Sequence, residues 1–306
     1  MAERQTATYL NERFAAAGLR PLTRFGQNFL IDLNLLDLIV RAAEIGSQDV
    51  VLEVGTGMGS LTTRIAEQAA AVVTVEIDDN LAELSREELA RYTNIQQLHV
   101  DVLKNKHTLA PEVLQSVGQV LATTGAEARF MLVANLPYNI ATPLVSNLLV
   151  GPLPPDRMVV TIQKELADRI TASPGSKDYG ALSVWVQSQC AAQIVRVMPP
   201  QVFWPRPKVE SAILRIDLQP ERRAAIDDLK FFHETVRALF FHRRKFLRSV
   251  ACSAFKGRLS KTIVDVILAQ AGYTGDERAE QLTIDQFLEL TRNFRAALQK
   301  RDQPNG

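Results

Sequence analysis

Several features are scarce or missing in this 306-residue sequence. It has only two cysteines, Cys190 and Cys252, whose separation matches no metal-ligand pair, so we expect two isolated thiols. No stretch approaches the roughly 18 uninterrupted apolar residues of a membrane-spanning helix. Residues 1–7 contain no apolar segment of the kind that begins a secretory signal. These absences predict a cytoplasmic protein with no disulfide, no bound metal and no membrane anchor.

Excess charge of one sign is also missing. Lysine and arginine number 35 against 34 acidic residues, a formal net charge of +1, so the overall charge indicates no class of partner. The apolar fraction of 46% is sufficient for a hydrophobic core, and the length fits one large or two medium domains.

Apolar runs alternate with amphipathic helical patterns from residue 34 to residue 162. This alternation predicts an α/β fold with a doubly wound, Rossmann-like parallel sheet. The predicted strands are 50–54, 72–75, 95–100, 130–134 and 158–162, and the runs 190–198 and 212–218 are later, possibly antiparallel, strands. The predicted helices are 7–18, 34–44, 60–70, 80–92, one within 111–121, and 142–149.

The pattern changes near Pro220. From residue 227 onward, apolar residues recur only at helical spacing. We therefore predict an α/β domain over 1–219 and a smaller all-helical domain over 220–306.

A glycine-rich turn, Gly55-x-Gly57-x-Gly59, follows the first apolar strand. Glycine lets a backbone approach a ligand closely, although the same pattern suits any nucleotide site or a tight strand–helix turn. Position 60 is serine, so the dinucleotide pattern is not completed. Glu53 beside the turn would repel phosphate and suits a cation such as a sulfonium with an amino group; a surface salt bridge is the alternative.

Two more strand ends carry carboxylates. Glu76 stands 21 residues after Gly55, where an acidic side chain accepts hydrogen bonds from both hydroxyls of a ribose. Asp101 follows the third strand and either accepts from an adenine amine or caps a turn. Together these strand ends predict a cationic nucleoside cofactor, which we interpret as S-adenosylmethionine.

The fourth of these strands ends in Asn135-Leu136-Pro137-Tyr138. An exocyclic amine of adenine is a poor nucleophile because its lone pair is delocalised into the ring. Two acceptors on its hydrogens, the Asn135 side-chain oxygen and the Leu136 carbonyl, would make the nitrogen more nucleophilic. Pro137 fixes the backbone and brings no competing donor, and Tyr138 offers a ring for stacking. This motif predicts methyl transfer to an adenine.

Five motifs in this order resemble the ribosomal RNA adenine dimethyltransferases, in particular the bacterial small-subunit type. They are Gly26-Gln27-Asn28-Phe29-Leu30, Glu53-x-Gly55-x-Gly57-x-Gly59, Val75-Glu76-Ile77-Asp78, Asn135-Leu136-Pro137-Tyr138-Asn139-Ile140 and Phe203-x-Pro205-x-Pro207-Lys208-Val209. The resemblance implies a class I methyltransferase domain followed by a helical domain.

Further roles follow from the resemblance alone. Gln27 and Asn28 would contact the methionine end of the cofactor, with Leu30 beside it. Phe203 would stack on the target adenine opposite Tyr138, whereas without the family it is equally a core aromatic. The full predicted cofactor site is Gln27, Asn28, Leu30, Glu53, Gly55, Gly57, Glu76, Ile77, Asp101, Val102 and Asn135. Residues 105–126 look like an insertion relative to the family, and we expect them to form a helix against the sheet edge.

Local charge indicates where RNA binds. Between residues 221 and 261 there are 11 lysines and arginines and 4 acidic residues, so the segment carries 11 − 4 = +7. Such a segment is a candidate phosphate track, with a solvated helix face as the alternative. The predicted RNA-binding residues are Arg222, Arg223, Arg243, Arg244, Lys245 and Arg248.

The combined prediction is a monomeric enzyme that transfers methyl groups from S-adenosylmethionine, by direct displacement, to two adjacent adenines of small-subunit (16S) ribosomal RNA. The expected partner is a partly assembled small ribosomal subunit. Two alternatives are a methyltransferase of large-subunit RNA and a binding protein that keeps this fold without the chemistry. Intact Glu53, Gly55, Glu76 and Asn135 disfavour the second alternative.

Overall fold

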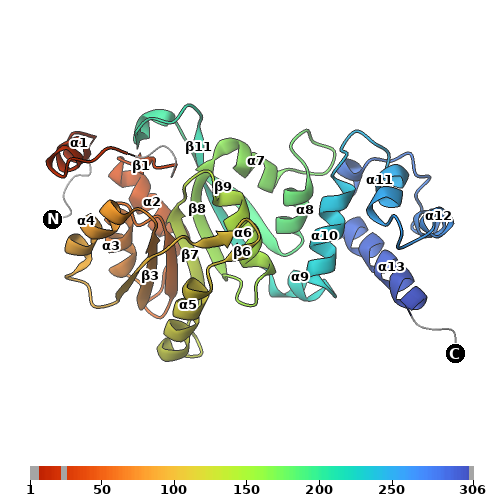
Figure 1. Ribbon diagram of the computed structural model, residues 1–306, viewed down its shortest axis with the longest axis horizontal. Coiled ribbons are helices and arrows are strands. Elements are labelled where there is room, and N and C mark those ends of the chain that lie inside the picture. Colours follow the sequence, from red (N-terminus) through yellow and green to blue (C-terminus); the bar gives the residue numbers. More distant parts are fainter. Residues whose placement is uncertain (1–6, 22–25, 303–306) are drawn as a thin grey trace. The chain divides into compact units, whose positions relative to one another are not determined.

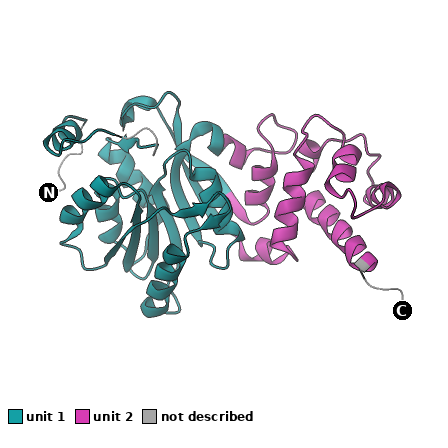
Figure 2. Ribbon diagram, viewed as in Figure 1, with its two compact units in different colours: residues 1–167, 192–218 teal, residues 168–191, 219–306 magenta. Residues whose placement is uncertain are grey.

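The computed structural model describes residues 7–21 and 26–302. The chain divides into two compact units, one comprising residues 1–167 and 192–218 and the other comprising 168–191 and 219–306 (Figure 2). The sequence places a single boundary at 219/220, but the second unit also takes in residues 168–191. The chain enters this unit twice, so no single cut along the sequence separates the two.

A seven-stranded sheet forms the centre of the first unit (Figure 1). Its strands are β2 (Val50–Val54), β3 (Ala71–Glu76), β4 (Ile95–His99), β7 (Phe130–Asn135), β8 (Arg157–Gln163), β9 (Cys190–Met198) and β11 (Ser211–Leu218). Their order is β4-β3-β2-β7-β8-β11-β9; neighbours from β4 to β8 are parallel, and β11 runs antiparallel to β8. The predicted doubly wound sheet is confirmed, and its strand order reverses between β2 and β7, where such sheets bind ligands.

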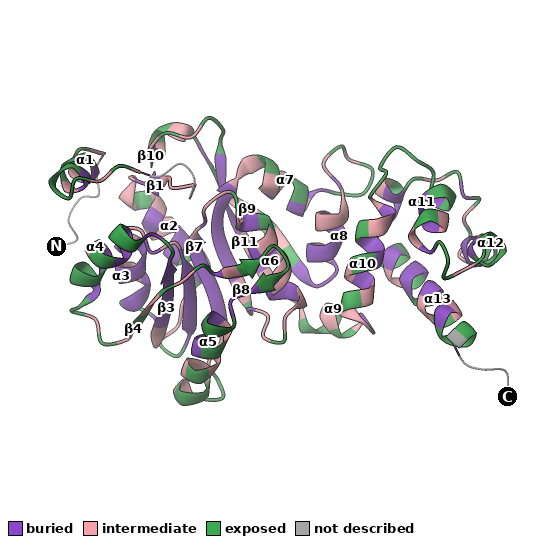
Figure 3. Ribbon diagram, in the orientation of Figure 1, coloured by how far each residue is buried: buried purple, intermediate pink, exposed green. Residues whose placement is uncertain are grey.

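Helices cover both faces of this sheet. Two adjacent glutamines of β4 illustrate this arrangement, because each contacts a helix on a different face. Side chains alternate between faces along a strand. Gln97 donates to the Ala82 carbonyl of α4 (Asp79–Leu89) at 3.1 Å, whereas Gln96 accepts from Ser116 of α5 (Pro111–Thr124) at 2.8 Å. Helices α2 (Leu33–Ala43) and α3 (Ser60–Ala66) pack with the sheet in one apolar cluster, and α6 (Ala141–Val150) follows β7. The central strands β2, β3, β7 and β8 are buried on both faces, whereas the edge strands β4 and β9 are partly exposed (Figure 3).

The insertion at 105–126 does form a helix, α5, preceded by the small hairpin of β5 (Leu103–Asn105) and β6 (Thr108–Leu109). The expected position is wrong, however. Helix α5 contacts β2 and β3 in the middle of the sheet and so lies on its face. Val113 and Val117, one helical turn apart, are fully buried and form the apolar stripe that brings it there.

A separate two-stranded pair and the N-terminal helix complete the first unit. Strand β1 (Phe29–Leu30) pairs with β10 (Phe203–Trp204), although the two segments are more than 170 residues apart. Helix α1 (Ala7–Ala16) packs its Phe14 ring edge-on against the rings of Phe29 and Trp204, at 5.6 and 5.3 Å. The sequence did not predict this pairing, because two-residue strands carry no periodicity.

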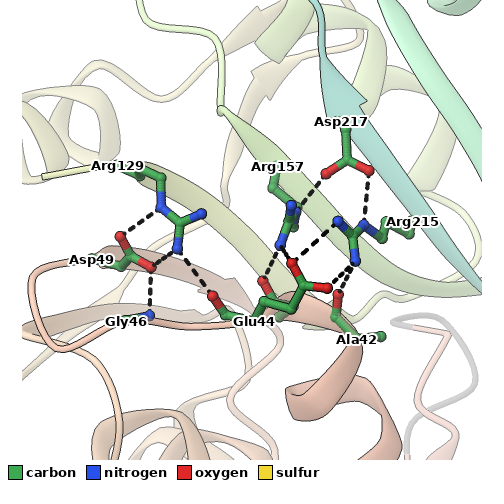
Figure 4. Close-up of polar contacts among 9 residues, drawn as sticks. Ala42, Glu44, Gly46, Asp49, Arg129, Arg157, Arg215 and Asp217 are labelled. Atoms are coloured by element: carbon green, nitrogen blue, oxygen red, sulfur yellow. Dashed lines mark hydrogen bonds and ion pairs between the residues drawn. The ribbon is translucent and has the colours of Figure 1, made fainter.

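An ion-pair cluster ties the carboxyl end of α2 to the amino ends of the parallel strands (Figure 4). Glu44 lies just after the helix in the left-handed region, with φ of 53°. Its carboxylate accepts from Arg157 at 2.7 Å and from Arg215 at 2.8 Å, and Asp217 bridges the same two arginines. The arginines also donate to the Ala42 and Ala43 carbonyls, which the helix leaves without partners.

The second unit is helical, and its core is aromatic. Its helices are α8 (Ala181–Gln187), α9 (Pro220–Ala224), α10 (Leu229–Leu239), α11 (Leu247–Ala254), α12 (Lys261–Gln270) and α13 (Ile284–Asp302), and α7 (Lys164–Thr171) crosses the boundary. Phe255 stacks on Phe294 at 4.3 Å, and Trp185 stacks on His233 at 4.4 Å. Among the described residues, no helix is long and apolar enough to cross a membrane.

Candidate active site

The carboxyl ends of β2, β3 and β7 border a cavity of about 300 Å³ at the point where the strand order reverses. A smaller cavity shares Phe29, Gly55, Gly57 and Asn135 with it. Of the predicted cofactor residues, those in the wall of the larger cavity are Gln27, Asn28, Gly55, Gly57, Glu76, Ile77, Asp101, Val102 and Asn135. The other two, Leu30 and Glu53, line the smaller cavity. The fold therefore gathers all eleven around two adjoining spaces.

The glycine-rich turn closely approaches its surroundings. Gly55 and Gly57 have φ of +87° and +56°, which side chains rarely adopt. A β-carbon on Gly57 would lie 3.2 Å from the Phe29 ring, and one on Gly55 would lie 3.5 Å from Pro137. The turn is thus packed between the β1 segment and the Asn-Leu-Pro-Tyr motif: a β-carbon on Gly57 would press on Phe29, and one on Gly55 would be in ordinary contact with Pro137.

Glu76 is a buried carboxylate, 5% exposed, and it organises the turn. One oxygen accepts from the Gly57 N–H at 2.9 Å, and the other accepts from the N–H groups of Ile77 and Asp78 at 3.0 Å. Burial raises the pKa of Glu76, and these three backbone donors oppose the rise. The first of these oxygens, Oε2, has accepted one hydrogen bond and retains a lone pair for a ligand hydroxyl, whereas Oε1 has already accepted two.

Glu53 is almost fully buried, and no described residue places a positive charge beside its carboxylate. Its Oε2 accepts from the hydroxyls of Thr62 and Thr74 at 2.6 and 2.7 Å. Burial raises the pKa of Glu53 to about 8, opposed by these hydrogen bonds. The surface salt bridge that the sequence left open is not present. A buried carboxylate of this kind is well suited to a cationic ligand in the smaller cavity.

Asn135 ends β7, and its amide nitrogen is already used. Nδ2 donates to the Asn28 carbonyl at 2.8 Å. No described residue donates to Oδ1 of Asn135 or to the Leu136 carbonyl, and both residues line the cavity. The amide is therefore oriented so that its oxygen remains as an acceptor.

The N-terminal motif is held to the rest of the site by side-chain hydrogen bonds. Gln27 donates to Asp78 at 2.8 Å, and Asn28 donates to the Gly26 carbonyl at 3.0 Å. Asp78 also caps α4 by accepting from the Asn80 N–H. Asp101 accepts from the Leu103 N–H at 2.9 Å, so it caps a turn while it also lines the cavity.

The two predicted stacking residues lie outside the lining of both cavities. Tyr138 is half-buried, and its hydroxyl is 2.6 Å from the Ser211 hydroxyl. Burial raises the pKa of Tyr138. Phe203 is 3% exposed and belongs to the apolar cluster that includes Leu30, its strand partner. Its ring packs as the core aromatic that the sequence kept as an alternative, and stacking by Phe203 stays a prediction.

The predicted RNA-binding residues fall into two groups within the second unit. Four arginines have partners there: Arg243 pairs with Glu280, Arg248 with Asp265, and Arg222 and Arg223 hydrogen-bond to Cys190 and Gln189. Arg244 and Lys245 are exposed, and no described residue forms an ion pair or hydrogen bond with either side chain. The structure therefore separates two available cations from four that also have structural contacts.

Sequence reasoning missed Thr62 and Thr74, the donors that hold Glu53. Thr74 lies opposite Glu53 in the register of β2 and β3, and Thr62 is in the first turn of α3. The strand register, once known, would have identified Thr74. Leu81 in the cavity wall was also missed, because it reads simply as part of the helix predicted at 80–92, and Ile140, which ends the Asn-Leu-Pro-Tyr-Asn-Ile motif, was given no role.

Comparison with known proteins agrees with this geometry. The family model described as ribosomal RNA adenine dimethylase matches residues 19–295. The ribosomal RNA small subunit methyltransferase A of Alkaliphilus metalliredigens is 41% identical over 273 residues, which cover 89% of this chain and 91% of that protein. The protein of the same name from Bacillus mycoides is 40% identical over 268 residues, covering 87% and 88%.

Solved structures share the fold. A dimethyladenosine transferase from Plasmodium falciparum superposes with a TM-score of 0.70 at 24% identity, covering 87% of this chain and 96% of that one. The 23S rRNA methyltransferase ErmE superposes with a TM-score of 0.61 at 26% identity, covering 87% and 98%. With a class I methyltransferase fold and a family match over most of its length, the chain belongs to the ribosomal RNA adenine dimethylase family.

Proposed function

We propose that this protein uses S-adenosylmethionine to dimethylate the exocyclic amines of two adjacent adenines in a 3'-terminal hairpin of small-subunit ribosomal RNA. Membership of the family and the names of the relatives support the reaction and the small subunit as its source of RNA. The observation that carries the proposal is the Asn135 side chain, whose nitrogen is bound to Asn28 and whose oxygen is left as an acceptor.

The residues of the two cavities fit this cofactor. Glu53 would hold the cationic amino group, because a buried carboxylate without a basic partner is stabilised by an incoming cation. Glu76 would accept from a ribose hydroxyl with the remaining lone pair of its Oε2, and Ile77 and Val102 would pack against the adenine of the cofactor. Glycines 55 and 57 allow the backbone to approach it closely.

S-adenosylmethionine, when bound, supplies a methyl group on a positively charged sulfur. The task of the chain is to hold an adenine amine in line with that group. The Asn135 oxygen and the Leu136 carbonyl would each accept one amine hydrogen, which draws the nitrogen lone pair out of the ring. Pro137 fixes the backbone between these acceptors and the glycine turn. Holding the reactants in this geometry supplies most of the acceleration.

The expected partner is a partly assembled small ribosomal subunit, and the modification would accompany its maturation. The excess of basic residues between 221 and 261 supports an RNA partner, since lysine and arginine neutralise backbone phosphates.

A labelling experiment tests the proposal. Unmethylated small subunits are incubated with the protein and S-adenosylmethionine, and modified adenines are mapped by primer extension and mass spectrometry. We expect dimethyladenosine at two adjacent positions, and no product with Asn135→Ala. Large subunits serve as the comparison substrate. Methylation there instead would favour the large-subunit alternative, and no methylation of either subunit would favour a binding protein.

A further inference from the structure

Phe241 is 80% exposed, and it is the most exposed of the large apolar side chains that the described residues present to solvent. It lies in the turn of residues 240–246, between α10 and α11 of the second unit. Every residue from Phe241 to Phe246 is exposed. A ring this accessible to water is available to contact another molecule.

The turn is held in place from inside the unit. The preceding ring, Phe240, stacks on Phe287 at 5.5 Å and contacts Tyr179 edge-on at 6.1 Å. Arg243 donates to Glu280 at 2.5 Å and to the Ser176 carbonyl at 3.1 Å. The exposure of Phe241 is therefore a property of an anchored turn, with little ordering left to be done on binding.

The residues that follow Phe241 in the sequence are basic. The His242 ring contacts it edge-on at 4.8 Å. Arg244 and Lys245 follow, both exposed, and no described residue forms an ion pair or hydrogen bond with either side chain. A flat apolar face beside two available cations matches a nucleotide, which has an aromatic base and an adjoining phosphate. It matches an apolar protein partner less well, because that partner would have to cover both charges.

We propose that Phe241 is a stacking platform for an unpaired base of RNA, and that Arg244 and Lys245 contact the phosphates beside that base. Stacking on an aromatic ring requires an accessible base face, so the site selects single-stranded or looped RNA over a continuous duplex. Arg243 instead holds the turn. This proposal rests on the proposed function only for the identity of the RNA that the protein binds, since base stacking is independent of methyl transfer.

The test measures binding by the full chain, without cofactor, of a ten-nucleotide single-stranded adenosine oligomer and of an RNA duplex of equal length. We expect Phe241→Leu, which keeps apolar area but removes the ring, to bind the single strand roughly tenfold more weakly. Phe241→Trp should retain binding, and its added indole fluorescence should be quenched by the oligomer. Val266→Ala, which trims another exposed apolar side chain of the same unit, is the control and should bind like wild type.

Wild-type affinity of Phe241→Leu would overturn the proposal and point to an apolar protein contact instead. Equal preference for duplex and single strand, no quenching in the tryptophan variant, or no wild-type binding would overturn it too. The double variant Arg244→Gln, Lys245→Gln should lower the slope of log affinity against log salt by about 1.4, at roughly 0.7 per contact to single strands. Because no methylation is measured, these outcomes remain separate from success or failure of the methylation experiment.

Discussion

The two ends of the central sheet hold carboxylates in opposite surroundings. At the amino ends of the strands, Glu44 lies between Arg157 and Arg215, whose hydrogen bonds lower its pKa to about 2. At the carboxyl ends, the described residues that donate to Glu53 are two threonines, and burial raises its pKa to about 8. Glu76 likewise has a pKa raised by burial.

This difference assigns different tasks to the two ends. The amino end is complete by itself, because Glu44, Asp49 and Asp217 each have an arginine partner and the last carbonyls of α2 have donors. The carboxyl end contains buried carboxylates that only a bound cation or hydroxyl would satisfy fully. Groups whose pKa is shifted by burial and that have no charged partner gather at functional sites, because a ligand supplies the charge that the fold does not. Four changes test this contrast, from the largest expected effect to the smallest.

The largest effect is expected from Asn135→Ala. Removing the acceptor should lower methyl transfer by about 100-fold or more, since the amine loses its orientation. Binding of small subunits should persist, because Asn135 lies at the carboxyl end of β7 and not in the basic segment of residues 221–261. Turnover is measured with labelled S-adenosylmethionine and subunit binding by sedimentation. Wild-type turnover, or loss of all subunit binding, would contradict the assigned role.

Glu76→Ala should weaken binding of S-adenosylmethionine by about 2–3 kcal/mol, because hydrogen bonds to a charged acceptor are lost. The substitution also removes the acceptor for the Gly57 N–H, so Glu76→Gln separates loss of charge from loss of turn geometry. Titration calorimetry gives the dissociation constants. Glu83→Ala, at an exposed glutamate of α4, is the control. An unchanged dissociation constant in the Glu76→Ala variant would refute the ribose assignment.

Glu53→Gln should weaken cofactor binding about tenfold yet stabilise the free protein at pH 8. The pKa of Glu53 is about 8 in the folded protein against an ordinary value of 4.5. Between these pH values the unfolded chain has released the proton, and Glu53 takes one up when the protein folds. Wild-type stability from this group therefore falls as pH rises from about 4.5 to about 8. Urea denaturation across that range should give a flatter profile for the variant, and parallel profiles would contradict the buried-carboxylate interpretation.

Glu44→Gln should have the smallest effect and the opposite pH dependence. Its folded pKa is lowered to about 2, so the stabilisation is fully present above about pH 4.5 and is lost as pH falls toward 2. The difference in unfolding free energy between wild type and variant should shrink over that window. Glu83→Gln, an exposed glutamate of α4, should show no such window. Cofactor affinity should not change in either variant.

Most of the strands and the site composition could be predicted from the sequence. Strand β2 and strand β9 begin and end at the predicted residues, because long β-rich apolar runs bounded by turns are strong local signals. Helix α8 was missed, since seven residues give too few turns for a periodic pattern. The pairing of β1 with β10 was missed because two-residue strands carry no periodicity. The return of residues 168–191 to the second unit was also missed, because it depends on contacts with residues distant in the sequence.

By itself the sequence determined the family, the doubly wound sheet and the residue types at each strand end, because these depend on local patterns and on motifs that recur intact. Only the tertiary structure decided what state those residues are in. Strand register placed Thr74 beside Glu53, packing buried Phe203, and the paired acids left Arg244 and Lys245 as the available cations of their turn. Burial and partners set the charge and reach of a side chain, and both come from residues distant in the sequence.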